Sequence, residues 1–408
     1  MSSVETKSDS DGSRLKQPLR VAIVGGGGHV GLPFGLLLSD IGHTVTLVDQ
    51  NAERLDQIRC GEMPFHERGA ESLLPRCLAS GRLRMALSLK ESPQQDVIIV
   101  TIGTPVDEYL DPSVRQFDQV LNAVLAECRR GQLLVVRSTV FPGVTERLGR
   151  IVADRDLGID VAYCPERIAQ GWALDELTRL PQLVSGCTKI ASRRAGEFFA
   201  DLGVKVIELS TVEAELGKLY TNSYRYINFA ISNQFYMLAE RYGADFDRVR
   251  QAITDNYPRM NGFAGAGFAG GPCLLKDTMQ LASFNHNLLT LGQTAMVVNE
   301  GLPGFLVDRL KADQDLTDAT IGILGMAFKG NCDDSRSSLS YKLRKILTLE
   351  CRRVLCTDPY IQDPDFVSLE STLAESDILI LGACHDDYRS LKTDKPIVDV
   401  FGFLSRRS

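Results

Sequence analysis

No apolar run in this chain of 408 residues approaches the roughly 18 residues that a membrane-spanning helix needs, so we expect no membrane insertion. Residues 1–17 are rich in Ser, Asp and Lys and lack the apolar core of a signal peptide, which predicts a disordered tail. The ten cysteines lack paired spacing, which favours free thiols and a cytoplasmic protein over a disulfide framework. The formal charge of −7 argues against nucleic acid as the main partner.

The composition describes an ordinary globular protein, with 44% hydrophobic and 24% charged residues. A chain of this length exceeds what a single hydrophobic core organises, so two or three domains are expected. No pattern of metal ligands stands out, and we predict no metal site.

A buried strand over 19–24 leads into a glycine-rich turn with a G-x-G-x-x-G pattern at Gly26, Gly28 and Gly31. A helical stretch over 32–41 follows, and the next strand ends on Asp49. This order of strand, glycine turn, helix, strand and acid is typical of a dinucleotide-binding unit, in which the pyrophosphate approaches the helix N-terminus. Asp49 would accept both ribose hydroxyls of NAD and repel the 2′-phosphate of NADP. A tight turn without a ligand is the less favoured alternative.

Three further strands, at 96–101, 132–136 and 159–163, each end at a polar turn. Ligands of an open parallel sheet bind beyond the carboxyl ends of its strands. We therefore expect the polar residues of these turns at the cofactor edge or facing the crevice: Thr104, Ser138, Thr139, Glu166 and Arg167. For Glu166 and Arg167, a solvated loop pair is the alternative.

Residues 212–242 form one long helical pattern whose apolar stripe exceeds what a single domain core needs. We expect this helix to pack against a second copy of the chain as well, giving a homodimer or a higher homo-oligomer. Lys218 and Asn222 lie four residues apart on one face of it. They are either ordinary surface residues or, if a reactive group lies nearby, able to hold an oxyanion.

The stretch 265–277 combines a glycine-rich approach with Pro272, Cys273, Lys276 and Asp277. Gly-Pro predicts a helix that starts at Pro272 and places Cys273 in the first turn, where the helix dipole favours a thiolate. Lys276 and Asp277 follow on the same face. A lone cysteine at a helix cap is more often a buried structural residue, so only the rest of the chain can decide between the two interpretations.

From 320 onward a second α/β layout repeats the first: strands at 320–324, 353–356, 377–381 and 395–399, with a glycine turn but no G-x-G-x-x-G. The predicted fold is α/β, with two Rossmann-like, doubly wound parallel-sheet domains joined by a central helical region with a long helix. We predict a cofactor-binding domain over 18–210, a central helical, dimerisation and catalytic domain over 211–312, and a second nucleotide-binding domain over 313–408.

Six motifs occur in order along residues 19–403. They are Gly26-x-Gly-x-x-Gly31-Leu-Pro, Ser138-Thr139, Pro165-Glu166-Arg167-Ile168, Lys218-x-x-x-Asn222, Gly271-Pro272-Cys273-Leu-x-Lys276-Asp277 and Gly325-x-x-Phe328-Lys329. Together they resemble the nucleotide-sugar 6-dehydrogenases, the UDP-glucose/GDP-mannose dehydrogenase family. The Glu166-Arg167 motif and Tyr257-Pro258-Arg259 look like the UDP-N-acetylhexosamine branch, chiefly its UDP-N-acetylmannosamine enzymes.

The resemblance implies two successive NAD-dependent oxidations of a sugar C6 alcohol, to the aldehyde and then to the acid. Lys218 and Asn222 would stabilise the C6 oxyanion, and Asp277 would assist proton removal. Cys273 would hold the aldehyde as a thiohemiacetal and then a thioester. Thr139 and Glu166 would position the water that hydrolyses it.

The resemblance also implies two sets of binding residues. Expected to contact NAD are Gly26, Gly28, His29, Val30, Gly31, Asp49, Arg54, Thr104, Ser138, Thr139, Lys276 and Arg336. Expected to contact the UDP-sugar are Glu166, Arg167, Lys218, Asn222, Arg259, Gly267, Phe268, Gly270, Gly271, Phe328 and Lys329. Arg259 resembles an arginine that the family sends across the dimer interface.

Some positions depart from the family pattern. Gln170 stands where many relatives have glutamate and is left out of the catalytic set, and Cys332 replaces a usual threonine. Other functions remain open: a UDP-glucose 6-dehydrogenase, a two-electron dehydrogenase of the 6-phosphogluconate type, or a non-catalytic nucleotide-sugar sensor.

Overall fold

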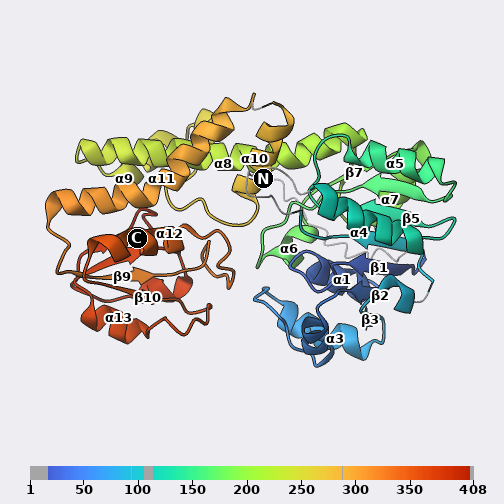
Figure 1. Cartoon of the computed structure of the whole chain (residues 1–408), viewed down its shortest axis with the longest axis horizontal. Coiled ribbons are helices and arrows are strands. Elements are labelled where there is room, and N and C mark those ends of the chain that lie inside the picture. The colour runs from blue at the N-terminus through green and yellow to red at the C-terminus, as the bar shows by residue number, and fades with distance from the viewer. Residues whose placement is uncertain (1–16, 93, 105–113, 287, 405–408) are drawn as a thin grey trace, which may run out of the picture. The chain divides into compact units, whose positions relative to one another are not determined.

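The computed structural model describes residues 17–92, 94–104, 114–286 and 288–404. Residues 1–16 of the predicted tail lie outside this range. The chain forms two compact units, and the division between them falls within helix α8 (Thr211–Arg241), between Leu216 and Gly217. Each unit contains its own β-sheet (Figure 1).

The first unit is built on an eight-stranded sheet with the order β3-β2-β1-β4-β5-β6-β7-β8. Its strands are β1 (Arg20–Val24), β2 (Thr44–Val48), β3 (Leu83–Ala86), β4 (Val97–Val100), β5 (Leu133–Val136), β6 (Asp160–Tyr163), β7 (Gln182–Gly186) and β8 (Val206–Glu208). The helices are α1 (Gly31–Asp40), α2 (Ala52–Arg59), α3 (Ala70–Ala79), η1 (Leu89–Glu91), α4 (Val114–Glu127), α5 (Val144–Asp154), α6 (Ala173–Leu177) and α7 (Lys189–Ala200).

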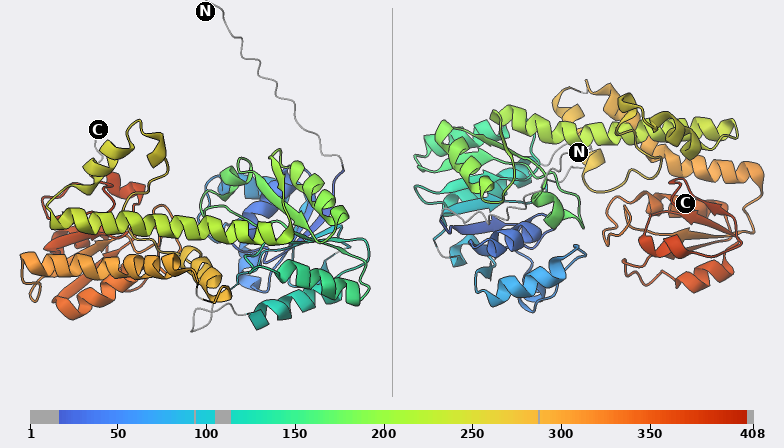
Figure 2. Two further views of the ribbon diagram at one scale, coloured as in Figure 1. Left: turned by 90° about the horizontal axis from the view of Figure 1, so that it is seen from above. Right: turned by 180° about the vertical axis from the view of Figure 1, so that it is seen from behind.

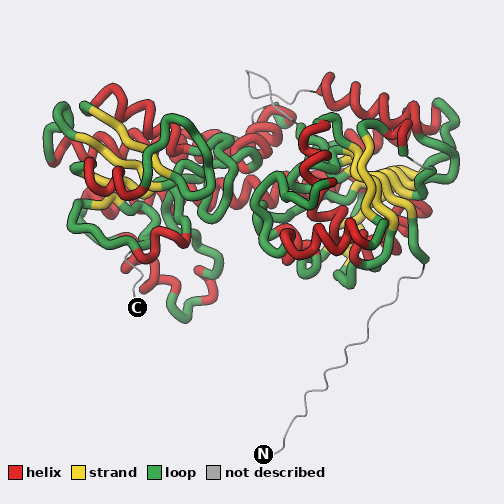
Figure 3. Tube along the Cα trace, turned by 90° about the horizontal axis from the view of Figure 1, so that it is seen from below, coloured by secondary structure: helices red, strands yellow, loops and turns green. Residues whose placement is uncertain are grey.

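The strands of this sheet lie side by side with a progressive twist, and helices cover it (Figure 3). All pairs are parallel except β6 with β7, which run antiparallel through the pairs of Ala162 with Gly186 and Tyr163 with Ser185. Strand order reverses between β1 and β4, because β1 pairs in parallel with β2 on one side and with β4 on the other. Such a reversal opens a crevice at the carboxyl ends of the strands, where the predicted cofactor residues lie.

The central strands of the first unit are continuous apolar runs because they lie in the hydrophobic core. Val97 to Val100 of β4 and Leu133 to Val136 of β5 are buried along their whole length, because helices cover both faces of the sheet. Phe34 of α1 and Phe199 of α7 stack with ring centroids 5.8 Å apart.

The second unit carries a four-stranded parallel sheet with the order β10-β9-β11-β12. Its strands are β9 (Thr320–Leu324), β10 (Arg353–Thr357), β11 (Ile378–Leu381) and β12 (Ile397–Val398). Beyond α8 its helices are α9 (Phe246–Thr254), η2 (Pro258–Met260), α10 (Leu274–Phe284), α11 (Thr290–Asp313), α12 (Leu339–Glu350), α13 (Leu369–Glu375) and η3 (Asp386–Ser390). The predicted α/β fold with two parallel sheets is confirmed.

Helices α8 and α11 run side by side in the second unit (Figure 2). Buried amides join them: Asn299 Nδ2 donates to the Tyr226 carbonyl oxygen at 3.1 Å, and Asn233 Nδ2 donates to Asn299 Oδ1 at 2.9 Å. Pro303 lies inside α11. Because the amides satisfy one another, the helix pair tolerates polar groups in its interior.

Candidate active site

Cys273 lies at the N-terminal end of α10, but not within its first turn as predicted. The helix begins at Leu274 and Cys273 is its N-cap residue, whose carbonyl oxygen accepts the Asp277 N–H at 2.8 Å. Gly271 adopts φ +101°, a left-handed conformation, and the first residue of the helix is Leu274, with the Cys273 carbonyl as the first acceptor. Cys273 is exposed.

Asp277 is buried completely and is held from two sides. Asn222 Nδ2 donates to Asp277 Oδ2 at 2.6 Å, and Lys276 Nζ lies 3.0 Å from Asp277 Oδ1. The structure therefore brings together three residues predicted to act on the substrate or the cofactor. Lys276 was expected near the cofactor, and here it is the counter-ion of the carboxylate.

Lys218 lies one helical turn before Asn222 on α8, and both side chains are buried. Their predicted alternative as ordinary surface residues is therefore wrong. A buried lysine and a buried amide on one helix face provide a positive charge and N–H donors, and such groups stabilise an oxyanion. The helix supplies this spacing because residues i and i+4 share a face.

Arg336 is paired with Asp334 through a forked contact: Nη2 lies 2.6 Å from Asp334 Oδ2, and Nε lies 2.9 Å from Oδ1. This hydrogen bond raises the pKa of Arg336, and the nearby Cys273 and Cys332 act in the same direction. A cation near Cys273 would favour its thiolate form.

Eight of the ten cysteines are buried or half-buried. Cys60 and Cys273 are the exposed members of the ten, all of which lie in the described residues. Burial raises the pKa of the Cys332 thiol to about 11 and that of the Cys164 thiol to about 12. Because the thiolate is the nucleophile, these two side chains are inert at neutral pH.

The glycines that precede Cys273 are required by close packing. A Cβ on Gly267 would lie 2.3 Å from the Phe401 ring, and one on Gly271 would lie 2.6 Å from the Phe328 ring. Gly270 packs against the Ser337 carbonyl oxygen, 2.8 Å from where its Cβ would lie, and Phe268 is buried. Packing within the protein therefore explains why these positions carry no side chain.

The turn after β9 carries Phe328 and Lys329, and a buried carboxylate organises it. Asp358 Oδ2 accepts the N–H groups of Met326 at 2.6 Å and of Ala327 at 2.9 Å. His385 Nε2 lies 3.1 Å from the same oxygen. In the first unit the acid after the second strand is Asp49, whose two oxygens likewise accept backbone N–H groups, from Gly27 and Asn51.

The glycine turn of the first unit has the shape that a dinucleotide needs. A Cβ on Gly26 would lie 2.7 Å from the Ile23 carbonyl oxygen, and one on Gly31 would lie 2.4 Å from that of Gly25. A Cβ on Gly28, in contrast, would meet only the Gly25 carbonyl oxygen, at 3.4 Å. The first and third glycines thus serve packing, and the second leaves room for the pyrophosphate.

Asp49 lies beside this turn. Its Oδ2 accepts the Gly27 N–H at 3.0 Å, and the Arg54 side chain passes 3.0 Å from where a Gly27 Cβ would be. A cavity of about 670 Å³ opens here, lined by Gly28, Asp49, the turn that follows β4 and residues of η1 and α4. The residues present fit the adenosine half of NAD, with apolar walls for the adenine and a carboxylate for the ribose.

The other predicted residues of this edge lie in the loops after the strands. His29 packs on Phe65 with ring centroids 4.0 Å apart, and Val30 is the N-cap residue of α1. Ser138 is buried, Thr104 and Thr139 are half-buried, and all three follow β4 or β5.

Glu166 and Arg167 follow β6 and are both half-buried, so they are more than a solvated loop pair. Glu166 Oε2 accepts the Ile168 N–H at 3.0 Å. Arg167 donates to the Pro181 carbonyl oxygen, and burial lowers the pKa of its guanidinium. Part of its donor capacity therefore serves the fold.

Arg259 lies in η2 and is exposed. Its Nη1 donates to the Tyr257 hydroxyl at 3.1 Å, and its guanidinium lies 5.7 Å from the centroid of that ring. The structure thus leaves Arg259 at the surface of its unit.

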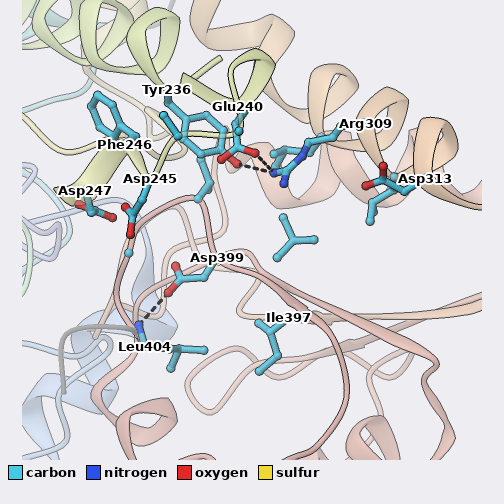
Figure 4. Close-up of a pocket in the computed structure, with 17 residues that line it drawn as sticks. Tyr236, Glu240, Asp245, Phe246, Asp247, Arg309, Asp313, Ile397, Asp399 and Leu404 are labelled. Carbon is cyan, nitrogen blue, oxygen red and sulfur yellow. Dashed lines mark hydrogen bonds and ion pairs between the residues drawn. The ribbon is translucent and has the colours of Figure 1, made fainter. Parts of the chain in front are cut away.

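A second cavity, of about 720 Å³, lies between α8, the start of α9, α11 and the segment around β12 (Figure 4). Acidic side chains gather around it, and Arg309 pairs with Glu240 within it. None of the predicted site residues lines it. The cavity is therefore separate from the candidate active site.

Comparison with known proteins agrees with this geometry. Three models of the UDP-glucose/GDP-mannose dehydrogenase family match the chain: the NAD binding domain at residues 19–202, the central domain at 212–301 and the UDP binding domain at 322–406. The chain belongs to this family. It is an NAD-dependent nucleotide-sugar dehydrogenase, and NAD is its cofactor.

The similar curated proteins include a UDP-N-acetyl-D-mannosamine dehydrogenase from Pyrococcus horikoshii, 28% identical over 91% of each chain. An NDP-N-acetyl-D-galactosaminuronic acid dehydrogenase from Ralstonia nicotianae is 27% identical over 95% of this chain and 97% of that one. Among solved structures, a UDP-glucose dehydrogenase from Pyrobaculum islandicum has a TM-score of 0.86 at 26% identity, covering 96% of both chains. The UDP binding domain supports a UDP-sugar as substrate. None of the helices in the described residues combines the length and apolarity needed to cross a membrane.

The structure also shows residues that sequence reasoning missed. Asn233 fixes the glycine stretch, because its Oδ1 accepts the Gly267 N–H at 2.8 Å and its Nδ2 donates to the Gly267 carbonyl oxygen at 3.0 Å. Asp358 and His385 hold the turn that carries Phe328. The Asp at the end of a predicted strand was a usable signal for Asp358, and Asn233 belongs to an Asn-Gln pair where the family usually has Asn-Glu, whereas nothing local marked His385.

Proposed function

We propose that this protein oxidises the C6 hydroxyl of a UDP-N-acetylhexosamine, most specifically UDP-N-acetylmannosamine, to the uronic acid. The observation that carries the proposal is the group of Asn222, Lys276 and Asp277 around the helix that Cys273 caps. The Glu166-Arg167 motif, the Tyr257-Pro258-Arg259 motif and the names of the mannosamine relatives support the N-acetylated sugar. UDP-glucose is the alternative substrate, supported by the solved UDP-glucose dehydrogenase.

In the first oxidation Lys218 and Asn222 bind the C6 oxygen as its proton leaves, and their charge and N–H groups stabilise the developing alkoxide. Asp277, held by Asn222 and Lys276, takes up the proton through water. NAD, when bound, accepts a hydride from the sugar carbon in each oxidation.

In the second oxidation the Cys273 thiolate adds to the C6 aldehyde and forms a thiohemiacetal. Loss of the C6 hydride converts this adduct into a thioester, in which the carbon is at the oxidation level of the acid. Water held by Thr139 and Glu166 adds to the thioester carbonyl, the carbon–sulfur bond breaks, and the uronic acid and the thiolate are released. Two hydrides, four electrons in total, leave each sugar.

Gly267, Phe268, Gly270, Gly271, Phe328 and Lys329 are proposed to hold the UDP moiety, with Arg167 and Arg259 at the sugar nucleotide. Lys329 supplies a positive charge for a phosphate, and its Nζ lies 5.8 Å from the Phe328 ring centroid. Arg336 is proposed to reach the cofactor. The division into regions 18–210, 211–312 and 313–408 is part of this proposal.

We infer that the chain forms a homodimer or a larger homo-oligomer through α8. Tyr220, Tyr224, Ile231, Phe235 and Leu238 of this helix are 42–65% exposed, which is more apolar surface than a solvated helix usually carries. In this assembly Arg259 would reach the active site of the neighbouring copy. The free thiols support a reducing cytoplasm as the compartment.

The test is the NADH yield with four candidates: UDP-N-acetylmannosamine, UDP-N-acetylglucosamine, UDP-glucose and GDP-mannose. Two NADH per sugar are expected, with the highest kcat/KM for UDP-N-acetylmannosamine. One NADH per sugar would indicate the two-electron alternative, and no NADH with any of the four would indicate a non-catalytic sensor. Cys273→Ser is expected to release no free acid, and normal acid production by this variant would refute the thioester route.

A further inference from the structure

Arg137 is an arginine in the core of the first unit. Its side chain is 1% exposed, and its guanidinium carbon lies 4.5 Å from the Phe34 ring centroid and 5.0 Å from that of Phe199. Arginine is rarely buried to this extent, and an apolar side chain would fill the same space without desolvating a charge. The aromatic faces recover part of that cost through cation–π attraction. A buried cation in this position calls for a reason beyond packing.

The hydrogen bonds of Arg137 indicate that reason. Its Nη1 donates to the Cys164 carbonyl oxygen at 3.2 Å and to Gln182 Oε1 at 2.9 Å. Gln182 Nε2 in turn donates to the Pro165 carbonyl oxygen at 3.0 Å. Arg137 and Gln182 therefore donate hydrogen bonds to the two consecutive carbonyl groups that directly precede Glu166.

The charge state of Arg137 is compatible with this role. Burial lowers the pKa of its guanidinium to about 10, and Cys164, Glu166 and Tyr163 act in the opposite direction. Arg137 thus stays protonated at neutral pH, and Glu166 lies within its electrostatic reach. Charge-assisted hydrogen bonds to carbonyl groups are stronger than neutral ones.

Arg137 is also the residue directly before Ser138 and Thr139. The N–H groups of Arg137 and Ser138 both donate to the Val100 carbonyl oxygen, at 2.9 and 3.2 Å. One residue thus fixes the start of the Thr139 turn through its backbone and the Glu166 turn through its side chain. These turns carry the two residues assigned above to the hydrolytic water.

We propose that Arg137, together with Gln182, is a positioning residue for thioester hydrolysis, setting the Glu166 turn relative to Thr139. The inference rests on the proposed function, since it concerns the last step of that reaction. Neither residue touches the substrate in this role. Removing the contact should misplace Glu166 and slow hydrolysis while the two hydride transfers continue.

The variants are Arg137→Met, which keeps the length and removes the donors, and Gln182→Leu, which breaks the Pro165 contact from the other side. Arg194→Met is the matched control, because Arg194 pairs with Asp160 at 2.6 Å at the opposite end of the same strand, β6. Rapid-mixing NADH absorbance gives the burst and the steady-state rate. Intact mass of the quenched enzyme reports the acyl group on Cys273.

For Arg137→Met and Gln182→Leu we expect a burst of two NADH per subunit at the wild-type rate, followed by turnover about 10- to 100-fold slower. The acylated enzyme should accumulate, and hydroxylamine should restore turnover by cleaving the thioester. Arg194→Met should behave as the wild type. Should Arg137→Met fail to fold, as judged by its thermal melt, Gln182→Leu alone decides the question.

Wild-type turnover in both variants, or an equal loss in burst and steady state without acylated enzyme, would overturn the inference. The failure of the proposed function looks different, because the wild type itself would then fail to produce two NADH per sugar. A merely structural role for Arg137 would lower the melting temperature without separating the burst from the steady state.

Discussion

The Asn222 amide nitrogen donates to an Asp277 carboxylate oxygen at 2.6 Å, joining α8 to α10 across 55 residues of sequence. Asp277 is fully buried and its other oxygen lies 3.0 Å from Lys276 Nζ. One contact thus connects the residue proposed to bind the oxyanion with the residue proposed to take the proton. Changing either side chain should alter both the chemistry and the stability of the helix pair.

Asn222→Ala should lower kcat for NADH formation by about 10- to 100-fold, because it removes an oxyanion donor and frees Asp277. It should also reduce the free energy of unfolding by about 1–3 kcal/mol, since a buried carboxylate loses a donor. Steady-state kinetics and urea unfolding measure the two effects. Asn228→Ala on the same helix, which loses an exposed contact with the Gly262 carbonyl oxygen, is the control and should retain its kcat. Equal kinetics for the two variants would refute the role of Asn222.

Gly271→Ala should raise the KM for the UDP-sugar, because its Cβ would lie 2.6 Å from the Phe328 ring and push it away. The KM for NAD should change little. Gly262→Ala is the matched control: this glycine has φ +82° and no atom within 4 Å of a built Cβ, so it tests backbone strain alone. Similar KM values in both variants would show that strain, and not displacement of Phe328, is responsible.

His43 predicts a pH dependence of stability. Burial lowers the pKa of its imidazole from 6.5 to about 4, and its Nδ1 accepts the Leu19 N–H at 3.1 Å, which requires the neutral ring. Because the folded pKa of His43 lies below the unfolded one, the neutral ring contributes its full share to the free energy of unfolding above pH 6.5. This share is lost as the pH falls towards 4. The loss should reach about 3 kcal/mol.

Urea unfolding at pH 7, 5.5 and 4.5 should show this loss of unfolding free energy in the wild type. His43→Asn should not show the loss that His43 causes, because Asn accepts the Leu19 N–H without ionising. If both proteins lose the same free energy between pH 7 and 4.5, His43 is not its source.

Glu215 is a buried carboxylate at the start of α8 that caps α5. It accepts the Gly143 N–H at 2.7 Å, the Thr145 N–H at 2.8 Å and the Thr145 hydroxyl at 2.6 Å. Glu215→Ala should reduce the free energy of unfolding by about 2–4 kcal/mol, because it leaves these donors buried and unmatched. Glu213→Ala, at an exposed position two residues earlier where the carboxylate accepts only from Ser210, should lower the melting temperature less. Thermal melts of the two variants give the comparison.

Most of the fold could be predicted because its signals are local. The strands of the buried sheet centre are continuous apolar runs, and the predicted strand at 132–136 corresponds to β5 at Leu133–Val136. The strands β3, β7 and β8 were not predicted. They lie at one edge or beyond β6, and their short sequences, such as Val206–Glu208, carry little apolar signal of their own.

The start of α10 was predicted wrongly for a comparable reason. Gly-Pro ordinarily opens a helix, but the left-handed turn at Gly271 is set by its contacts with Phe328 and the Ser337 carbonyl oxygen, 57 and 66 residues away. Likewise nothing near His385 marked it as a support of the site, because its partners Asn331 and Asp358 are distant in the chain.

The sequence by itself determined the chemistry that this protein has available: a glycine turn with Asp49 for NAD, and Lys218, Asn222, Cys273 and Asp277 in motifs whose spacing is local. Only the tertiary structure decided how these groups meet. The Asn222–Asp277 hydrogen bond and the hydrogen bonds of the buried Arg137 to the Cys164 carbonyl oxygen and to Gln182 each depend on packing between segments far apart in the chain. Hydrogen bonds and charges act over a few ångströms, and local patterns do not encode those distances.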